Sequence, residues 1–492
     1  MYVGGNRMEM GNTQVKTGDV AASDLRVVPI IISFVVAGFI GLFSETALNM
    51  ALTNLIENFG IHETTAQWLT TGYLLTLGIL VPVSGLIMQW FTTRQLFITA
   101  LVASIIGTFI AAIAPSFSVL MIARVVQAIG TALLLPLMFN TILMIVPPHK
   151  RGRIMGIIGL VIMFAPAVGP TISGLILKSL SWHWIFWISL PLLIGALIFG
   201  WIFMQNVTNP TKPKIDILSI VLSTFGFGGI VFGFSSAGEG GGWGSATVIV
   251  SMIIGAVSLL FFTIRQLKME QPVLNLRAFK YPMFTIGLLL VVVCMMVILS
   301  SMILLPLYLQ TSLSLSTFAA GLLLLPGGII NGILSPVMGG LFDKFGPKWL
   351  VTIGIVIVTG AMFGFSTITI ETSSAFIIAL HIITMVGVSM VMMPAQTNGL
   401  NQLPRELYPD GTAIMNTLQQ VAGAIGTAVA ISILSSGAEG FMSTVEDKAN
   451  PLNPLLAFTA GIQDAFVFAI IMGIVGLVVA LFIKRVKVEH PM

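Results

Sequence analysis

Long apolar runs, separated by short polar connectors, follow one another along almost the whole chain. Each run has at least about 18 residues, which is enough helix to cross a hydrocarbon layer about 30 Å thick. Turn-forming residues such as Pro147 and Pro148 mark the connectors. The pattern predicts fourteen membrane-spanning helices, near residues 27–52, 66–90, 95–114, 118–146, 153–177, 183–204, 217–236, 245–265, 283–310, 317–341, 348–368, 374–398, 412–437 and 463–484.

The composition agrees with an all-α polytopic membrane protein. Of the 492 residues, 56% are hydrophobic and only 8% are charged, against about 25% charged residues in soluble domains. The net charge of +4 comes from basic residues spread over many connectors, so no nucleic-acid-binding stripe is expected. Residues 1–26 mix acidic and basic side chains, unlike a secretion signal, and are expected to form a tail before the first helix.

The basic residues also predict the orientation of the chain. With the N-terminus in the cytoplasm, 19 Lys and Arg residues fall in cytoplasmic segments, Lys178 and Lys448 fall in outer loops, and Arg124 falls within a helix. Basic residues accumulate on the cytoplasmic side of membrane proteins. Because the number of helices is even, both termini are then cytoplasmic.

Two connectors resemble each other. The segment GLIMQWFTTRQLF (85–97) follows the second predicted helix, and GGLFDKFGPKWL (339–350) follows the tenth. Repeats of this kind are typical of transporters built from related halves. We therefore predict a cytoplasmic tail (1–26), a six-helix half (27–204), two inserted helices with their linkers (205–282), a second six-helix half (283–484) and a short cytoplasmic tail (485–492).

One acidic residue is isolated in the first predicted helix. Glu45 has no other ionisable residue between positions 27 and 52, and a charge at such depth costs at least roughly 2.5–3.5 kcal/mol. Counted from the helix ends, Glu45 and Arg124 both lie about 10 Å below the outer surface. They would neutralise each other if their helices are neighbours. Otherwise Glu45 reaches outward, and Arg124 only joins helix ends through backbone carbonyl groups.

Further polar residues leave two interpretations open. Gly41, Glu45 and Asn49 share one face of the first helix, which is typical either of a cavity or of a tight helix contact. His381, again about 10 Å below the outer surface, either takes part in proton transfer or is a neutral histidine bonded to a backbone carbonyl. Four amides either bind substrate or join neighbouring helices: Gln127, Asn140, Gln396 and Asn398.

The fifth predicted helix contains the segment APAVGPTISG (165–174). Pro166 and Pro170 each remove a backbone hydrogen bond and bend a helix. Gly169 and Gly174 allow close packing against a neighbour. A bent and tightly packed helix could seal one face of an alternating-access protein.

We find no enzymatic or metal-binding motif in the sequence. The phosphate-binding pattern GxxxxGK[ST] is absent. The five His residues are scattered, and the lone cysteine, Cys294, lies in an apolar run. We therefore expect no enzyme, no metal and no cofactor, and a driving force from an ion gradient or from the substrate's own gradient.

Four segments carry a resemblance to a known family. LMIARVVQAIGTA (120–132) and residues 165–174 resemble the fourth-helix and fifth-helix motifs of major facilitator drug:proton antiporters. WHWIFWISLP (182–191) is similar to the signature of the fourteen-span EmrB/QacA subgroup. GGLFDKFGPK (339–348) resembles the facilitator loop motif, with Asp343 at the position of its acid. Within the subgroup the chain is most similar to lincomycin-resistance-type exporters of Gram-positive bacteria.

The chain departs from the family motifs at two positions. The acid of the family's first-helix motif falls on Ser44, so that Glu45 lies one position later, about 100° round the helix. Gln89 stands where the loop motif of the first half would have its acid.

The resemblance implies a major facilitator fold in the cytoplasmic membrane and proton-driven, alternating-access export of hydrophobic or cationic drugs. We expect the protein to be a monomer. Its partners would be protons, small drug molecules and the lipid bilayer. From the interior polar residues we predict that Glu45, Arg124 and His381 couple transport to protons. We predict Asn49, Gln127, Asn140, Gln396 and Asn398 as cavity residues, and Pro166, Gly169, Pro170, Gly174 and Asp343 as gating residues. The alternative is a dedicated exporter of an endogenous metabolite or lipid, or an uptake symporter, on the same fold.

Overall fold

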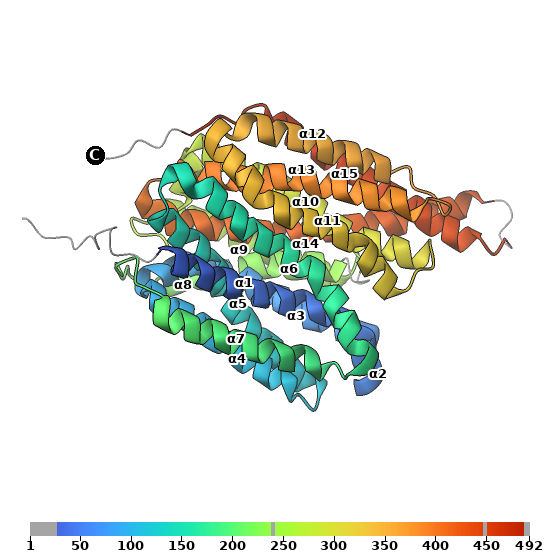
Figure 1. The fold of residues 1–492 in the computed structure, drawn as a ribbon, viewed down its shortest axis with the longest axis horizontal. Coiled ribbons are helices and arrows are strands. Elements are labelled where there is room, and N and C mark those ends of the chain that lie inside the picture. Colours follow the sequence, from blue (N-terminus) through green and yellow to red (C-terminus); the bar gives the residue numbers. More distant parts are fainter. Residues whose placement is uncertain (1–26, 238–241, 446–449, 487–492) are drawn as a thin grey trace, which may run out of the picture.

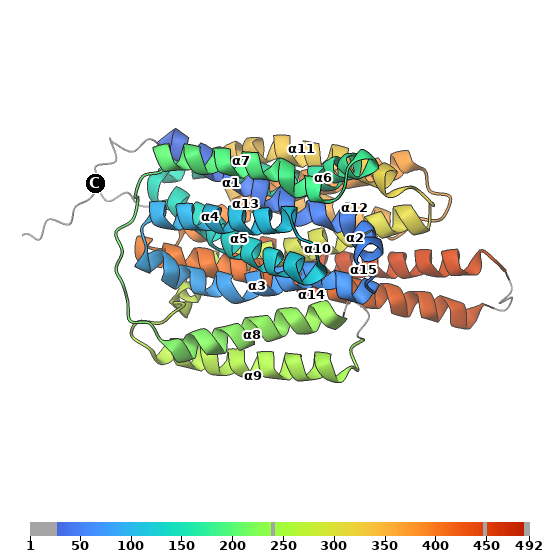
Figure 2. The ribbon, with the colours of Figure 1, turned by 90° about the horizontal axis from the view of Figure 1, so that it is seen from below.

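The computed structural model describes residues 27–237, 242–445 and 450–486. Within these residues, fourteen helices are long and apolar enough to cross a membrane, which confirms the predicted number. They run roughly along the long axis of the molecule (Figures 1 and 2). The start of α1 and the end of α15 lie at the same end of the bundle, which we call the terminal end, and the opposite end is called the far end.

The helices follow the apolar runs. Those before the inserted pair are α1 (Val27–Ala47), α2 (Leu52–Phe59), α3 (Glu63–Trp90), α4 (Thr93–Ala112), α5 (Phe117–Ile145), α6 (Arg151–Ser179) and α7 (His183–Phe203). The inserted pair is α8 (Ile217–Ser236) and α9 (Ala246–Lys268). Those after it are α10 (Pro282–Thr311), α11 (Thr317–Phe345), α12 (Pro347–Phe365), α13 (Ser374–Asn401), α14 (Tyr408–Thr444) and α15 (Asn453–Ala480).

Local sequence signals set several of these boundaries. Thr92 and Gln95 form a reciprocal capping box at the start of α4, which satisfies backbone N–H groups that have no partner within the helix. The Ser316 and Ser373 side chains accept a backbone hydrogen bond at the starts of α11 and α13. Gly60 adopts the left-handed conformation (φ 61°) that ends α2, a backbone state that glycine adopts without steric cost.

The structure corrects the predicted boundaries in two places. The first predicted span (27–52) is not one helix, because a short 3-10 segment at Leu48–Ala51 separates α1 from α2. The long outer connector predicted at 438–462 is largely helical, since α14 continues to Thr444 and α15 begins at Asn453. The 37 residues of α14 span roughly 55 Å, so α14 and α15 project beyond the other helices at the far end (Figure 2).

Helix packing divides the bundle into two sets of helices and an inserted pair. In the first set α5 packs on α3 and α4, and α1 packs on α6 and α7; in the second, α10 packs on α13, α14 and α15. The two sets meet along α6 and α11 and along α3 and α14. The inserted helices α8 and α9 pack on each other, and α8 lies against both α3 and α14. The predicted domain boundaries at residues 204, 282 and 484 stay a prediction.

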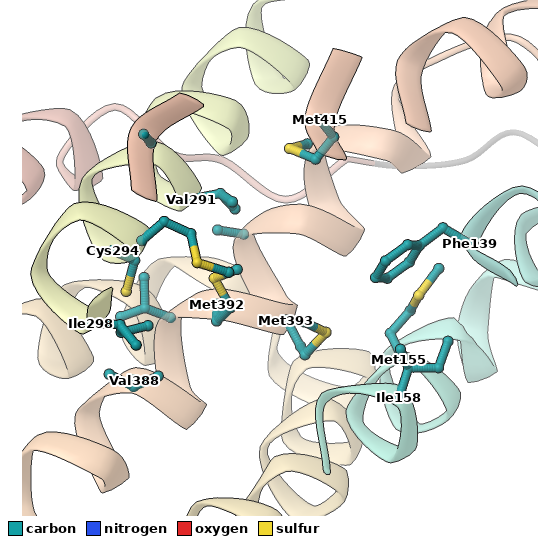
Figure 3. Packing of buried hydrophobic residues seen from close by; sticks show 14 of the residues in the cluster. Phe139, Met155, Ile158, Val291, Cys294, Ile298, Val388, Met392, Met393 and Met415 are labelled. Carbon is teal, nitrogen blue, oxygen red and sulfur yellow. The ribbon is translucent and has the colours of Figure 1, made fainter. Parts of the chain in front are cut away.

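A methionine-rich part of the core lies where the two sets meet. Met155 of α6 and Met393 of α13 are both buried, as is Phe139 of α5. Figure 3 shows Met393 directed towards Phe139 and Met155 across this interface. Methionine side chains are unbranched and flexible, so they repack readily. The two sets of helices therefore meet here through side chains that adapt to one another.

Candidate functional site

A buried arginine is the centre of the polar interior of the first helix set. Arg124 of α5 is only 1% exposed. Its Nη1 donates to the Ser44 carbonyl oxygen (3.4 Å) and to Gln127 Oε1 (3.1 Å), and its Nε donates to the Leu69 carbonyl oxygen (3.5 Å). The guanidinium carbon lies 4.2 Å from the centre of the Tyr73 ring, within the range of a cation–π interaction. Arg124 therefore joins α1, α3 and α5.

Gln127, one turn further along α5, extends this network. Its Nε2 donates to Thr108 Oγ1 of α4 (2.9 Å) and to Ser44 Oγ of α1 (3.5 Å). On the other side, Tyr73 Oη donates to Thr131 Oγ1 (2.8 Å). All these side chains are buried, and each bond satisfies a polar group that would otherwise be costly in a low-dielectric interior. Four helices thus contribute to one polar cluster.

The two remaining first-helix residues, Glu45 and Asn49, have side chains that lie outside the described part of the structure. Their backbone places them in α1 and in the 3-10 segment after it. A Cβ atom on Gly41 would lie 3.7 Å from Thr131 Oγ1 of α5, so the Gly41 face of α1 meets α5. Position 45 is one turn further on that face and directly follows Ser44, whose carbonyl contacts Arg124.

The helices that carry Glu45 and Arg124 are neighbours, and the Ser44 carbonyl meets Arg124 at the same depth. This is the condition that the sequence analysis set for an interaction between Glu45 and Arg124. The structure also supports part of the alternative interpretation, because Arg124 donates to two backbone carbonyl groups. Ser44, which occupies the family's acid position, is buried and contacts both Arg124 and Gln127. The acid position of the family motif therefore faces the polar cluster, with Glu45 adjacent to it.

His381 of α13 lies in a different place, in the second helix set. It is buried against α11, where a Cβ atom on Gly327 would overlap the imidazole ring. Its ring hydrogen-bonds the backbone of Leu324, and within the described residues Nδ1 has no hydrogen-bond partner. This environment favours the neutral, backbone-bonded histidine among the two interpretations, and the structure does not bring His381 to Arg124.

The cavity amides predicted in α5 and α13 divide into two groups. Asn140 and Gln396 are buried, and among the described residues Asn140 Oδ1 and Gln396 Nε2 have no hydrogen-bond partner. Gln396 Oε1 accepts from Gln419 Nε2 of α14 (3.4 Å). A buried polar atom without a partner calls for an explanation such as a bound water or ligand. These three residues are therefore candidates for substrate contact, and Gln419 was not apparent from the sequence.

Asn398 belongs to the terminal end rather than to this group. Its Nδ2 donates to the Lys484 carbonyl oxygen (2.9 Å), and its Oδ1 accepts from the Val486 N–H (3.1 Å). Both ends of the amide are occupied by backbone of the segment that follows α15. The structure does not support Asn398 as a cavity residue, because these bonds assign it to holding that segment.

Most of the predicted gating residues lie on α6. A Cβ atom on Gly169 would overlap Thr46 Oγ1 of α1, and one on Gly174 would lie 3.6 Å from the Phe318 ring of α11. The helix is continuous through Pro166, and the side chain of Pro170 lies outside the described part. Close packing at both glycines therefore places α6 between α1 and α11.

At the terminal end, Asp343 joins α11 to the start of α6. Its Oδ1 accepts from the Gly152 N–H (2.8 Å), and its Oδ2 accepts from the Arg153 N–H (2.9 Å). A carboxylate at a helix N-terminus satisfies free N–H groups and complements the positive end of the helix dipole. Asp343 therefore joins the two helix sets at this end, and its gating role stays a prediction.

Arg151 is a second cross-interface contact, which the sequence did not reveal because it looked like an ordinary loop arginine. It is 4% exposed. Its Nε donates to the Val146 carbonyl oxygen (2.9 Å) at the end of α5. Its Nη1 donates to Asn401 Oδ1 (2.7 Å) and to Tyr408 Oη (3.2 Å) in the other helix set. The only sequence signal for this role is its position two residues before the predicted helix at 153–177.

Fourteen spanning helices, a buried polar cluster between them and an interface closed by polar contacts define a polytopic membrane transport protein. The chain belongs to the Major Facilitator Superfamily, since its residues 34–427 match that family. This is a class of transporters, not of enzymes. The protein is therefore a multi-pass protein of the cell membrane.

Two relatives and one solved structure place it within the family. The chain is 67% identical to the lincomycin resistance protein LmrB of Bacillus subtilis over 96% of this chain and 98% of that protein. It is 26% identical to the multidrug export protein EmrB of Haemophilus influenzae over 91% of this chain and 88% of that protein. The proton:xylose symporter XylE has the same fold, with a TM-score of 0.62 at 16% identity over 93% of this chain and 94% of that one.

Proposed function

We propose that the protein exports hydrophobic or cationic drugs across the cytoplasmic membrane in exchange for protons. The observation that carries this proposal is the buried Arg124 cluster on the α1 face that bears Glu45. Intramembrane ionisable groups mark ion pathways because their burial is too costly without a function. The names of the 67% and 26% identical relatives, a lincomycin resistance protein and a multidrug export protein, support drugs as the substrate class.

In this proposal the terminal end faces the cytoplasm. The support is the distribution of charge, since 19 of the 22 Lys and Arg residues fall in segments assigned to this side and only two in the outer connectors. The Asp343 and Arg151 contacts then form a cytoplasmic gate.

Proton coupling then follows because the proton on Glu45, the Arg124 guanidinium and a cationic drug all compete for the Glu45 carboxylate. Glu45 takes a proton when the cavity is open to the outside, and neutral Glu45 no longer attracts Arg124. The weakened contact between α1 and α5 favours return to the inward-open state. Loss of the proton to the cytoplasm, or arrival of a cationic drug, restores the charged state and favours export.

Substrate contact is assigned to the interior groups that lack partners. Asn140 and Gln396 offer polar atoms that have no hydrogen-bond partner among the described residues, and Met155 and Met393 offer adaptable apolar side chains at the interface. A flexible apolar wall with few polar groups binds varied molecules, because it repacks around each. Such a lining supports a broad drug specificity.

The test is drug uptake into inside-out membrane vesicles driven by an acidic interior. Radiolabelled lincomycin and the fluorescent cation ethidium serve as probes. Glu45→Gln should abolish uptake driven by the pH gradient and leave some exchange that is independent of it, because the variant cannot take up or release a proton. Glu57→Gln removes a similar carboxylate from an exposed position of α2 and should leave transport unchanged.

Two results would count against the proposal. Unchanged pH-driven uptake by Glu45→Gln would remove Glu45 from the coupling mechanism. A response of the wild-type protein to one endogenous metabolite, with no transport of either probe, would replace drug export with a dedicated exporter.

A further inference from the structure

A groove at the far end lies outside the polar cluster and involves the inserted helices. It has a volume of about 860 Å³ and lies along α14 and α15, next to the connector between α8 and α9. Most of its wall is apolar, with Ile433 and Phe441 of α14 and Ala460 of α15. Trp243 of the connector and Asp464 of α15 complete it. We call this feature the far-end groove.

Trp243 is held in place with part of its surface free. Its Nε1 donates to Ser432 Oγ of α14 (2.6 Å). Its ring system lies nearly perpendicular to the Phe234 ring at the end of α8, with ring centres 5.5 Å apart and planes at 82°. The side chain nevertheless remains 41% exposed. An indole that is fixed at its N–H and open at its surface is suited to bind a cation or a flat apolar group.

Asp464 supplies a negative charge to the same groove. It precedes the end of α15 at Ala480 by 16 residues, or about 24 Å of helix, which places it near the far boundary of the hydrocarbon layer. Within the described residues the only ion pair joins Asp216 to Arg265, and none of the described hydrogen bonds involves Asp464. Its carboxylate faces a recess at Gly437, where a Cβ atom would lie 2.5 Å from Asp464 Oδ2.

We propose that the far-end groove binds lipophilic organic cations. An apolar wall takes up the hydrophobic body of such a molecule, the Trp243 ring provides a cation–π contact, and the Asp464 carboxylate, at an exposed position of α15, provides the counter-charge. An anion would meet the Asp464 carboxylate, and a neutral molecule would leave it unpaired. The inserted helices thereby gain a role, because their connector supplies the aromatic wall.

This binding site is separate from the Arg124 cluster and does not depend on proton coupling. Asp464 and Trp243 lie on α15 and on the α8–α9 connector, whereas Arg124 and its partners lie on α1, α3, α4 and α5. Binding at the groove should therefore persist in Glu45→Gln. If pH-driven export proves absent from the wild-type protein while groove labelling persists, the proposed function fails and this inference stands.

The experiment uses the full chain in lipid nanodiscs of anionic lipid and a photoreactive azido derivative of tetraphenylphosphonium. Labelled positions are mapped by mass spectrometry. Labelling should fall on α14, α15 and the segment around Trp243, in addition to any interior labelling. Unlabelled tetraphenylphosphonium should prevent it, and tetraphenylborate, an anion of similar size, should not.

Substitutions at Asp464 and Trp243 test separately the negative charge and the aromatic ring of the far-end groove. Asp464→Asn should raise the Kd of groove labelling roughly 2- to 5-fold, the range of an ion pair that is partly exposed. Trp243→Leu should raise it by roughly 2- to 5-fold as well, whereas Trp243→Phe, which keeps an aromatic face, should retain most of the affinity. Glu439→Gln, which neutralises an exposed acid of α14 outside the lining, should change nothing.

The inference is overturned by any of three results. Labelling confined to the interior helices would show that the groove binds no cation. Equal protection by tetraphenylborate, or an unchanged Kd in Asp464→Asn, would show that the charge of Asp464 has no role. Equal loss in Trp243→Phe and Trp243→Leu would assign Trp243 a structural role in place of a cation contact.

Discussion

The two places where the helix sets meet at the terminal end are built differently. Between α6 and α11, backbone lies directly on backbone, because Gly152 and Gly339 leave no room for a side chain, and Asp343 bonds two N–H groups of α6. Between α3 and α14 the approach is looser, since a Cβ atom on Gly85 would lie 3.3 Å from its nearest atoms in α14.

The second contact also lacks an acid from the loop that resembles the Asp343 loop. Gln89 stands at that position, and its carbonyl oxygen accepts from the N–H groups of Thr211 and Lys212 in the connector to the inserted pair (2.9 and 3.1 Å). The acid in this region is Asp410, within the first turn of α14, and its Oδ1 accepts from the Asn275 N–H (3.0 Å). Related loops thus serve different tasks, one closing the interface and the other anchoring a connector.

The largest effect should come from adding one methyl group to each contact. Gly339→Ala would bring a Cβ atom into the Gly152 backbone, and such overpacking costs about 1–3 kcal/mol. The cytoplasmic gate should then fail to close, with a loss of drug transport of roughly tenfold or more. Gly85→Ala should stay close to the wild-type rate. The transport rates of both variants are measured in inside-out vesicles, after their thermal stability in detergent has been shown to equal that of the wild-type protein. Equal losses of transport in Gly339→Ala and Gly85→Ala would show that the two contacts do not differ.

Removing the charge of Asp343 should have the next largest effect. A hydrogen bond to a charged group contributes about 1.5–3 kcal/mol, and Asp343→Asn keeps only part of it. Cysteine labelling at Ser335→Cys, a position buried against α6, should rise because the gate opens more often. Gln89→Ala should leave this labelling unchanged, because Gln89 is used through its backbone. A rise of the same size in Gln89→Ala would mean that both loops act as gates.

A smaller effect is expected from Arg151. Arg151→Lys cannot reproduce the separate bonds to Asn401 and Val146, because a lysine lacks the planar fork of donors. We expect a loss of gate stability of about 1 kcal/mol. A double-mutant cycle with Asn401→Ala should give a coupling energy of at least about 0.5 kcal/mol. Additive losses would show that the two residues do not act together.

The smallest effect is expected from the Asp216–Arg265 ion pair, which lies outside the α6–α11 and α3–α14 contacts. Arg265 donates to both carboxylate oxygens of Asp216 (2.7 and 2.9 Å) at the terminal end of the inserted pair, and this lowers the pKa of Asp216 from 3.8 to about 2. Since the folded-state pKa lies below the unfolded value, the pair stabilises the protein above pH 3.8 and loses this contribution as the pH falls towards 2.

Asp216→Asn should therefore lower the thermal stability at pH 7 by at most about 1 kcal/mol, since Arg265 is 39% exposed. The difference from the wild-type protein should shrink as the pH falls from 4 towards 2, and transport should not change. Thermal unfolding of the two proteins in detergent at several pH values measures it. A constant difference at all these pH values would contradict the assignment.

The features of the fold that the sequence predicted correctly are those that depend only on local composition. The number of spanning helices follows from apolar runs, because a membrane helix needs about 20 apolar residues whatever its neighbours are. The α14–α15 projection was missed for the same reason. Residues 438–444 contain Glu439 and few large apolar side chains, and residues 453–462 follow the polar stretch 443–450, so neither segment was recognised as part of a spanning helix. Packing of α14 and α15 on each other keeps both segments helical.

The candidate site was predicted in part. Arg124 and Gln127 stand out as polar residues in an apolar helix, and the structure places them in one buried cluster. Thr108 and Tyr73 could not be recognised, because Thr and Tyr are ordinary residues in membrane helices. Arg151 was missed because a basic residue next to a helix start is usually explained by orientation alone.

The sequence by itself determined that this is a fourteen-helix membrane protein of the major facilitator type with isolated charges in its interior, since hydropathy and motif spacing are properties of the chain alone. The tertiary structure decided which of these charges meet. Arg124 contacts the Ser44 carbonyl next to Glu45, Asp343 bonds the start of α6, and His381 lies apart from both. The physical reason is that the Arg124 and Asp343 contacts join residues 80 and 191 positions apart, so only the packing of whole helices brings them within bonding distance.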